Sequence, residues 1–88
     1  MTVYHIEIKQ SAKKELAQLP KTIAKKIALQ IMELADNPRH NGCKKLVGTE
    51  HSYRLRINNY RVIYSIFDQK LIIQVIKIGH RRNIYNKL

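Results

Sequence analysis

The stretch YRLRINNYRVIY, residues 53–64, consists of two alternating apolar and polar segments joined by a pair of asparagines. Such alternation is typical of β-strands with one buried face, and Asn-Asn suits a two-residue hairpin turn. That turn pairs Arg56 with Arg61 and places Arg54 on the same face, because side chains alternate along a strand. The expected opposite, buried face carries Tyr53, Leu55, Ile57, Tyr60, Val62 and Tyr64.

The flanking sequence completes an α+β pattern. The expected elements are a strand at residues 2–9, helices at 11–19 and 21–35, a short extended piece at 46–47, and strands at 51–57, 60–67 and 70–78. Ser11 is the expected N-cap of the first helix, Pro20 separates the two helices, and Gly79 closes the last strand. We therefore expect an N-terminal strand, a helical hairpin covering one face of the sheet, and an antiparallel three-stranded meander.

Length and composition favour one domain spanning residues 1–88. No apolar run approaches the about 18 residues of a membrane span, and the alternating N-terminal segment is unlike a signal peptide. Cys43 is the single cysteine, as is common in a reducing compartment. We expect a cytoplasmic protein with no membrane contact.

Positive charge dominates the sequence. Seventeen Lys and Arg against six Asp and Glu give a net charge of +11 over 88 residues. Such an excess predicts a polyanionic or acidic partner. No acidic residue lies between Glu50 and Asp68, so Arg54, Arg56 and Arg61 have no carboxylate beside them in the sequence. The planar guanidinium binds two phosphate oxygens at once, although a merely solvated arginine face is the alternative interpretation.

The segment GHRRNIY, residues 79–85, follows the last strand. Arg81 and Tyr85 would lie on one side of a helical turn, and His80 is the histidine best placed for proton transfer. We expect this segment to fold back over Arg61, on the arginine side of the sheet. We assign no functional role to His5, His40 and His51.

These motifs, in this order and over nearly the whole chain, resemble the RelE toxins of the RelE/ParE superfamily of bacterial type II toxin–antitoxin pairs. The resemblance implies a sheet like that of microbial ribonucleases and a metal-independent endoribonuclease, an mRNA interferase that cuts message on the ribosome. It also implies inhibition by a cognate antitoxin, which we expect to be acidic, and DNA contact only through that antitoxin. No cofactor is expected.

By this resemblance the family's strand arginines fall on Arg54, Arg56 and Arg61, and its tail residues on Arg81 and Tyr85. Cleavage would proceed by 2′-hydroxyl attack on phosphorus and would leave a 2′,3′-cyclic phosphate. We expect Arg61 and Arg81 to clamp the scissile phosphate, with Tyr85 as base and His80 as acid, or the reverse. Further RNA contacts are expected from Arg54, Arg56, Lys44, Lys45 and Arg82, and no metal-ligand set is evident in this region.

Three other functions are compatible with the pattern. A ParE-type protein would inhibit DNA gyrase, and a plain RNA-binding module would bind without cutting. A catalytically decayed toxin would serve as a repressor subunit. The full set of arginines with Tyr85 favours the nuclease, and aromatic stacking platforms are not evident, since Phe67 is the single phenylalanine and tryptophan is absent.

Overall fold

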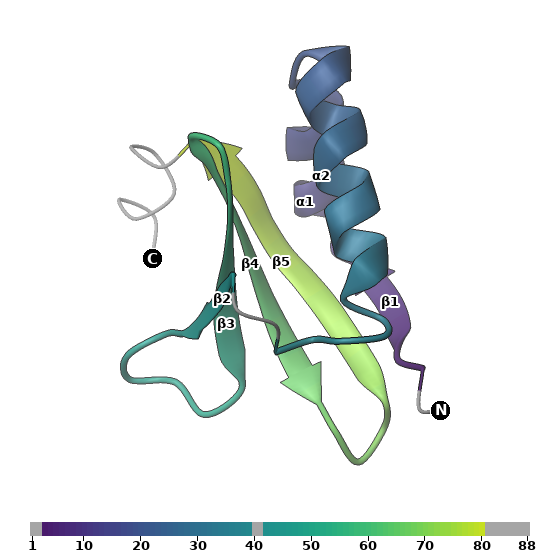
Figure 1. Cartoon of the computed structure of the whole chain (residues 1–88), viewed down its shortest axis with the longest axis vertical. Coiled ribbons are helices and arrows are strands. Elements are labelled where there is room, and N and C mark those ends of the chain that lie inside the picture. The colour runs from purple at the N-terminus through teal and green to yellow at the C-terminus, as the bar shows by residue number, and fades with distance from the viewer. Residues whose placement is uncertain (1–2, 40–41, 81–88) are drawn as a thin grey trace.

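A computed structural model describes residues 3–39 and 42–80 (Figure 1). These residues form a five-stranded mixed sheet with two helices, which confirms the expected α+β class. In chain order the elements are β1 (His5–Ile8), α1 (Gln10–Ala17), α2 (Lys21–Glu33), β2 (Cys43–Lys45), β3 (Ser52–Ile57), β4 (Tyr60–Phe67) and β5 (Ile72–His80).

The strands lie in the order β1-β5-β4-β3-β2. The expected meander β3-β4-β5 is present, and two short strands extend it: β1 pairs parallel to β5, and β2 pairs antiparallel to β3. The continuous apolar run in β5 fits its place inside the sheet, between β1 and β4.

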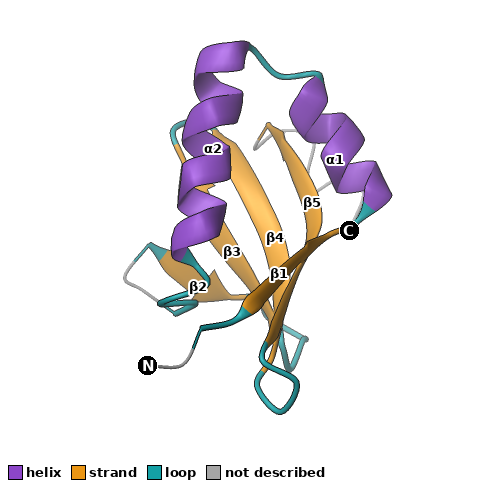
Figure 2. Ribbon diagram, turned by 90° about the vertical axis from the view of Figure 1, so that its right-hand side faces the viewer, coloured by secondary structure: helices purple, strands orange, loops and turns teal. Residues whose placement is uncertain are grey.

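Both helices cover the same face of the sheet, as expected (Figure 2). Ala12 of α1 and Ile27 and Ile31 of α2 are buried against the strands. Pro20 occupies the N-cap position of α2, where its missing N–H costs no helical hydrogen bond. Neither helix in the described part of the chain is long and apolar enough to span a membrane.

The core lies between the helices and the inner face of the hairpin β3–β4. Leu55, Ile57, Val62 and Tyr64 are buried there, and Tyr53 and Tyr60 pack against them half-buried. The Tyr64 hydroxyl donates a 2.6 Å hydrogen bond to the Pro38 carbonyl, so the largest buried side chain keeps its polar atom satisfied. The predicted apolar face of the hairpin is therefore confirmed.

Several predicted boundaries are wrong. β2 lies at Cys43–Lys45, within the expected loop, and residues 46–47 are not a strand, with Val47 fully exposed. Lys9 rather than Ser11 occupies the N-cap position of α1. Pairing with β3 makes a strand of the short CKK segment, although its composition predicts a loop.

The β4–β5 connection also differs from the expected two-residue turn. Phe67 pairs with Ile72, so residues 68–71 form a four-residue turn, and an irregularity between Ile63 and Tyr64 shifts the register further along. Because of the longer turn and the register irregularity, β5 continues through Gly79 and ends at His80 rather than before it.

A polar network anchors the connection after α2 to the tip of the β4–β5 hairpin. Arg39 donates hydrogen bonds of 2.7 and 3.2 Å to the two carboxylate oxygens of Asp68, and the Tyr4 hydroxyl donates one of 2.6 Å. The hydrogen bonds from Arg39, and then that from Tyr4, hold the pKa of the Asp68 carboxyl below its ordinary value. Arg39 also lies over the Tyr53 ring, 5.5 Å from its centre.

Glu15 of α1 closes the edge of β5 beyond the point where β1 ends. Its carboxylate accepts hydrogen bonds of 3.1 Å from the Ile78 backbone N–H and from the Lys77 ammonium. An open strand edge invites pairing with another chain, and a carboxylate on its N–H groups blocks such pairing. Glu15 therefore fixes the end of the strand that leads into the predicted tail motif.

We predict that Asp68→Asn lowers the free energy of unfolding at neutral pH and lowers it less as the pH falls. A carboxyl whose pKa is depressed by folding stabilises the native state above its unfolded pKa of about 3.9, and this contribution disappears as the pH drops through the folded value. Urea unfolding of both proteins between about pH 7 and pH 3 measures the difference. A difference that stays constant below pH 4 would contradict the assignment.

Candidate functional site

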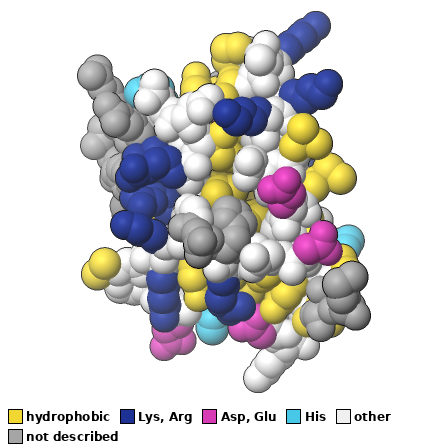
Figure 3. Space-filling view, in the orientation of Figure 1, with side chains coloured by type: hydrophobic (Ala, Val, Ile, Leu, Met, Phe, Trp, Pro, Cys, Tyr) yellow, Lys and Arg dark blue, Asp and Glu magenta, His cyan; other side chains and the backbone are white. Residues whose placement is uncertain are grey.

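Four cations share the face of the sheet away from the helices. Arg56 lies directly opposite Arg61, and Lys44 lies opposite Arg54. Because paired residues point to the same side of a sheet, these side chains form one surface, the arginine face, made of Lys44, Arg54, Arg56 and Arg61. Figure 3 shows Lys and Arg side chains gathered over the region where Figure 1 places β2 and β3. The predicted clustering of the three arginines is confirmed.

The arginine face is hollowed at its edge. A depression of about 280 Å³ is lined by Gly42, Lys44, Arg54 and Arg56. Three of its four lining residues are cationic, so the depression is suited to an anion rather than to an apolar ligand. The sequence did not predict Gly42 in this depression, because the pair Asn41-Gly42 indicates only a turn.

Arg61 is the least exposed cation of the arginine face. Only 6% of its surface is exposed, and its Nη1 donates a 3.4 Å hydrogen bond to the Tyr60 carbonyl. Its Nε is buried without a hydrogen-bond partner. A buried guanidinium with an unused donor destabilises the protein unless an anion completes it. The side chain is therefore held ready for an anionic ligand.

The neighbour of Arg61 on β5 is Gly79, which has no side chain to cover the guanidinium. A methyl group placed on Gly79 would meet no atom within 4 Å. Among the described residues, the space beside Arg61 is therefore open. Gly79 therefore leaves room beside Arg61. The sequence motif had indicated only that this glycine ends a strand.

The acidic side chains of the described residues form their ion pairs away from Arg56 and Arg61. All six acidic residues lie in the described ranges, and those that form ion pairs there bind elsewhere: Glu15 to Lys77, Asp68 to Arg39 and Glu50 to His51. Two arginines directly opposite each other repel by tenths of a kcal/mol or more. Since none of these ion pairs involves Arg56 or Arg61, an anion bound between the two arginines would offset their repulsion.

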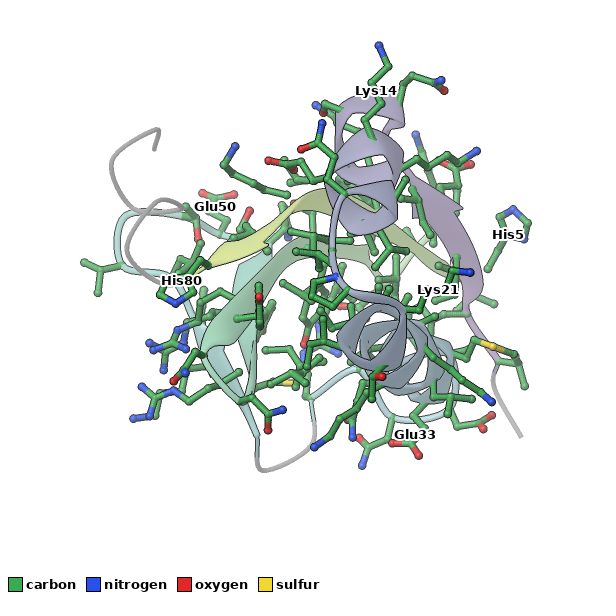
Figure 4. All side chains as sticks on the ribbon, turned by 90° about the horizontal axis from the view of Figure 1, so that it is seen from above. His5, Lys14, Lys21, Glu33, Glu50 and His80 are labelled. Carbon is green, nitrogen blue, oxygen red and sulfur yellow. The ribbon has the colours of Figure 1, made fainter. Side chains whose placement is uncertain are left out.

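His80 does not lie over Arg61, contrary to our expectation. β5 continues through His80, which pairs with Tyr60, and the two rings meet edge to face with centres 5.6 Å apart. The alternation of β4 gives this pair the opposite side of the strand from Arg61. Figure 4 shows His80 at the end of β5, at the rim of the sheet. The four-residue turn between β4 and β5 and the register shift between Ile63 and Tyr64 account for this position of His80.

Lys45 pairs with Tyr53, so it projects to the other side of β2 from Lys44. The structure therefore brings Lys44, but not Lys45, onto the arginine face. Arg81, Arg82 and Tyr85 lie outside the described residues, and their places in the site stay predictions.

Within the described ranges, no group of three or more His, Cys, Asp and Glu side chains is arranged to hold a metal ion. The chemistry available on the arginine face is electrostatic. Fixed guanidinium groups can bind a phosphate and stabilise negative charge that develops on its oxygens. Proton transfer at such a phosphate would need a titratable group, and the nearest described residues of that kind in the strand register are Tyr60, next to Arg61 on β4, and its partner His80 on β5.

Comparisons with known proteins agree with this architecture. The model of a family described as the ParE toxin of type II toxin–antitoxin systems matches residues 6–85. The mRNA interferase toxin RelE of Escherichia coli K12 is 30% identical over 80 residues, which cover 89% of this chain and 83% of that protein.

Solved structures show the same fold. The RelE–RelB complex from Pyrococcus horikoshii gives a TM-score of 0.80 at 32% identity, covering 94% of this chain and 99% of that one. A mutant of E. coli toxin RelE in the free state gives 0.81 at 25% identity, covering 94% and 88%. These similarities confirm the resemblance drawn from the arginine hairpin and the tail motif. This chain belongs to the ParE toxin family of type II toxin–antitoxin systems and is a RelE-type toxin of the RelE/ParE superfamily.

Proposed function

We propose that this toxin is an mRNA interferase, an endoribonuclease that cuts message on the translating ribosome without a metal ion. The observation that carries the proposal is the buried Arg61 guanidinium, which has an unused donor, lies directly opposite Arg56 and forms no ion pair with an acidic side chain of the described residues. The name of the E. coli relative, mRNA interferase toxin, supports the same activity. The cytoplasm is the compartment in which such a substrate is available.

The proposed reaction is an internal transfer at phosphorus. The 2′-oxygen attacks the adjacent phosphorus as its proton passes to a base, and the bond from phosphorus to the 5′-oxygen breaks as an acid protonates that oxygen. The products are a 2′,3′-cyclic phosphate and a 5′-hydroxyl end. Negative charge grows on the non-bridging oxygens during this step, so fixed cations lower its barrier.

Each cation of the arginine face has a role in this proposal. Arg61 binds the scissile phosphate, because its guanidinium is buried and held by the sheet, and Arg81 completes the clamp. Arg54 and Arg56 bind that phosphate or a flanking one, and Lys44 lines the same depression. Arginine keeps its proton at all working pH values, so these residues supply charge and do not transfer protons.

Tyr85 and His80 are the proposed proton-transfer pair, with Tyr85 as base and His80 as acid, or the roles exchanged. An arginine beside a phenol favours the tyrosinate, so Tyr85 would be suited to the role of base if it binds next to Arg61 or Arg81 in the complex with RNA. His80 lies against the Tyr60 ring at the rim of the sheet, one strand position from the pair of Arg61 and Gly79 and on the other side of the strand. Its protonated form carries a proton available for the leaving 5′-oxygen.

The proposed partners are messenger RNA, the ribosome and a cognate antitoxin. Structures similar to this chain are toxin–antitoxin complexes, such as RelE–RelB from P. horikoshii. The net charge of +11 favours an acidic antitoxin, and electrostatic steering would make its association fast. Contact with DNA would be indirect, through the antitoxin. A further phosphate contact is proposed for Arg82.

A second candidate function is inhibition of DNA gyrase, because the matching family model is that of ParE toxins. Gyrase inhibition needs no cleavage chemistry and gives no reason for a buried guanidinium with an unused donor at Arg61. A supercoiling assay with purified gyrase separates the two functions.

We predict that the purified toxin, added to translating ribosomes, cuts message and leaves 2′,3′-cyclic phosphate ends. Sensitivity of the new ends to acid and to a cyclic phosphodiesterase identifies them. On pre-assembled complexes, brief chelation of free divalent ions should leave the single-turnover rate unchanged, since the arginines supply the stabilising charge. Intact message together with inhibited supercoiling would instead establish the gyrase function.

We predict that Arg61→Met lowers single-turnover cleavage by about 10²-fold or more and leaves the thermal midpoint unchanged or higher. Loss of a fixed cation at a developing oxyanion accounts for the first effect. Removal of a buried, incompletely bonded charge accounts for the second, because methionine fills a similar volume at no desolvation cost. Lys25→Met, on the exposed surface of α2, serves as the charge-matched control. Full cleavage by Arg61→Met would remove this residue from the site.

We predict that Tyr85→Phe lowers cleavage by about 10²–10⁴-fold, the usual scale of general acid–base catalysis, without loss of ribosome binding. His80→Ala should act in the same direction, and the double variant should lose less than the product of the two effects. Tyr60→Phe keeps the ring against His80 and serves as the control for a lost phenol. If Tyr85→Phe cuts at the normal rate, the base must be sought elsewhere, beginning with His80.

A further inference from the structure

A second hollow lies at the opposite end of β4 from Arg61. It encloses about 340 Å³ and is lined by His51, Phe67, Asp68, Gln69 and Lys70. Phe67 is 37% exposed, and its ring centre lies 6.0 Å from that of His51 at a tilt of 41°. The hollow therefore presents an aromatic wall together with an amide and an ammonium group.

The exposed Phe67 lies on the same side of the sheet as the arginine face. Arg61, Ile63, Ser65 and Phe67 alternate along β4 and therefore point the same way. Opposite them, Arg56 pairs with Arg61, Arg54 with Ile63, and Ser52 with Ser65, whose hydroxyls lie 3.0 Å apart. One face of the hairpin thus runs from the guanidinium groups, over a serine pair, to the aromatic hollow.

The spacing along β4 fits a short stretch of single-stranded RNA. Phe67 lies six positions along β4 from Arg61, which is about 20 Å at the rise of a β-strand. A stacked strand advances about 3.4 Å per nucleotide. A chain with a phosphate on Arg61 therefore brings a base to Phe67 within about six nucleotides, and within fewer when it is extended.

The charges around the hollow favour the same ligand. Lys70 is an exposed cation available to a phosphate, and Gln69 offers both a donor and an acceptor to the edge of a base. The Asp68 carboxylate is already bonded to Arg39 and Tyr4, which offsets its charge. Glu50 lies 3.7 Å from the His51 ring and is the second acidic group here. A neutral, flat nucleobase avoids repulsion from either carboxylate.

We infer that the hollow at Phe67 is a base-stacking subsite, which holds one nucleobase of the RNA whose phosphate lies on Arg61. The ring of Phe67 stacks on the base, His51 borders it, and Lys70 binds the adjoining phosphate. This inference rests on the proposed function, because it takes RNA as the ligand of the arginine face. It adds a second, separate contact that would fix the register of the message relative to the cut.

The test uses the absence of tryptophan from the sequence. Phe67→Trp creates a single reporter in the hollow, and 2′-O-methyl oligoribonucleotides of two to eight residues, which cannot be cut, are the probes. A base stacked on the indole should quench its fluorescence saturably once the probe is long enough to reach it. An abasic probe of equal length keeps the phosphates and should bind without quenching.

The parent chain provides the affinity measurement. Base–aromatic stacking predicts that Phe67→Leu weakens binding of the longer probes by about 5- to 100-fold. Binding of probes too short to reach the hollow should not change. Leu71→Ala, which changes another exposed apolar residue of the same turn, is the matched control. Thermal unfolding of each variant verifies that it folds.

Three results would overturn the subsite: no quenching in Phe67→Trp, equal quenching by the abasic probe, or unchanged affinity in Phe67→Leu. Weakened antitoxin binding by Phe67→Leu with normal RNA binding would likewise reject it and assign the hollow to a protein contact. These outcomes are separate from failure of the nuclease proposal, which is measured by message cleavage with the unmodified toxin.

Discussion

The pairing of Ile57 with Tyr60 across the Asn58-Asn59 turn determines the rest of the molecule. Asn58 adopts a positive φ of 53°, a conformation that asparagine tolerates better than most residues. This two-residue turn fixes which side of β3 and β4 meets the helices. A slip of one residue in either strand would bury its arginines and expose its apolar residues. The register of the hairpin therefore also decides whether the cationic surface forms.

The same constraint explains why a destabilising surface can persist. Two opposed arginines and a buried guanidinium work against folding, while the inner face of the same hairpin buries Leu55 and Val62 completely against the helices. Each fully buried side chain of this kind contributes about 1.5–3 kcal/mol, which exceeds the repulsion of tenths of a kcal/mol between opposed like charges. The apolar side of the strands thus stabilises the arrangement that the cationic side opposes.

The sequence was sufficient for the parts of the fold that depend on local alternation. The bounds of β4, the pairing of Arg56 with Arg61, and the helical hairpin on one face follow from residues close together in the chain. β2 was missed because a three-residue edge strand depends on its partner β3 rather than on its own composition. The position of His80 was missed because a four-residue turn and a register irregularity, neither signalled by a motif, decide what lies beside Arg61.

The position of Gly79 shows that the strand register, and not only the identity of the cationic residues, decides what lies beside Arg61. Any larger side chain at this place in β5 would stand beside Arg61 and occupy space that the described residues leave open. An anion that enters this space screens the repulsion between Arg61 and Arg56, so binding stabilises the folded chain. A phosphate of RNA and a carboxylate of a protein both meet this requirement. Electrostatics alone therefore does not distinguish a substrate from an inhibitor, and the discrimination must come from contacts outside the cationic cluster, where the shape and chemistry of the sheet differ from end to end.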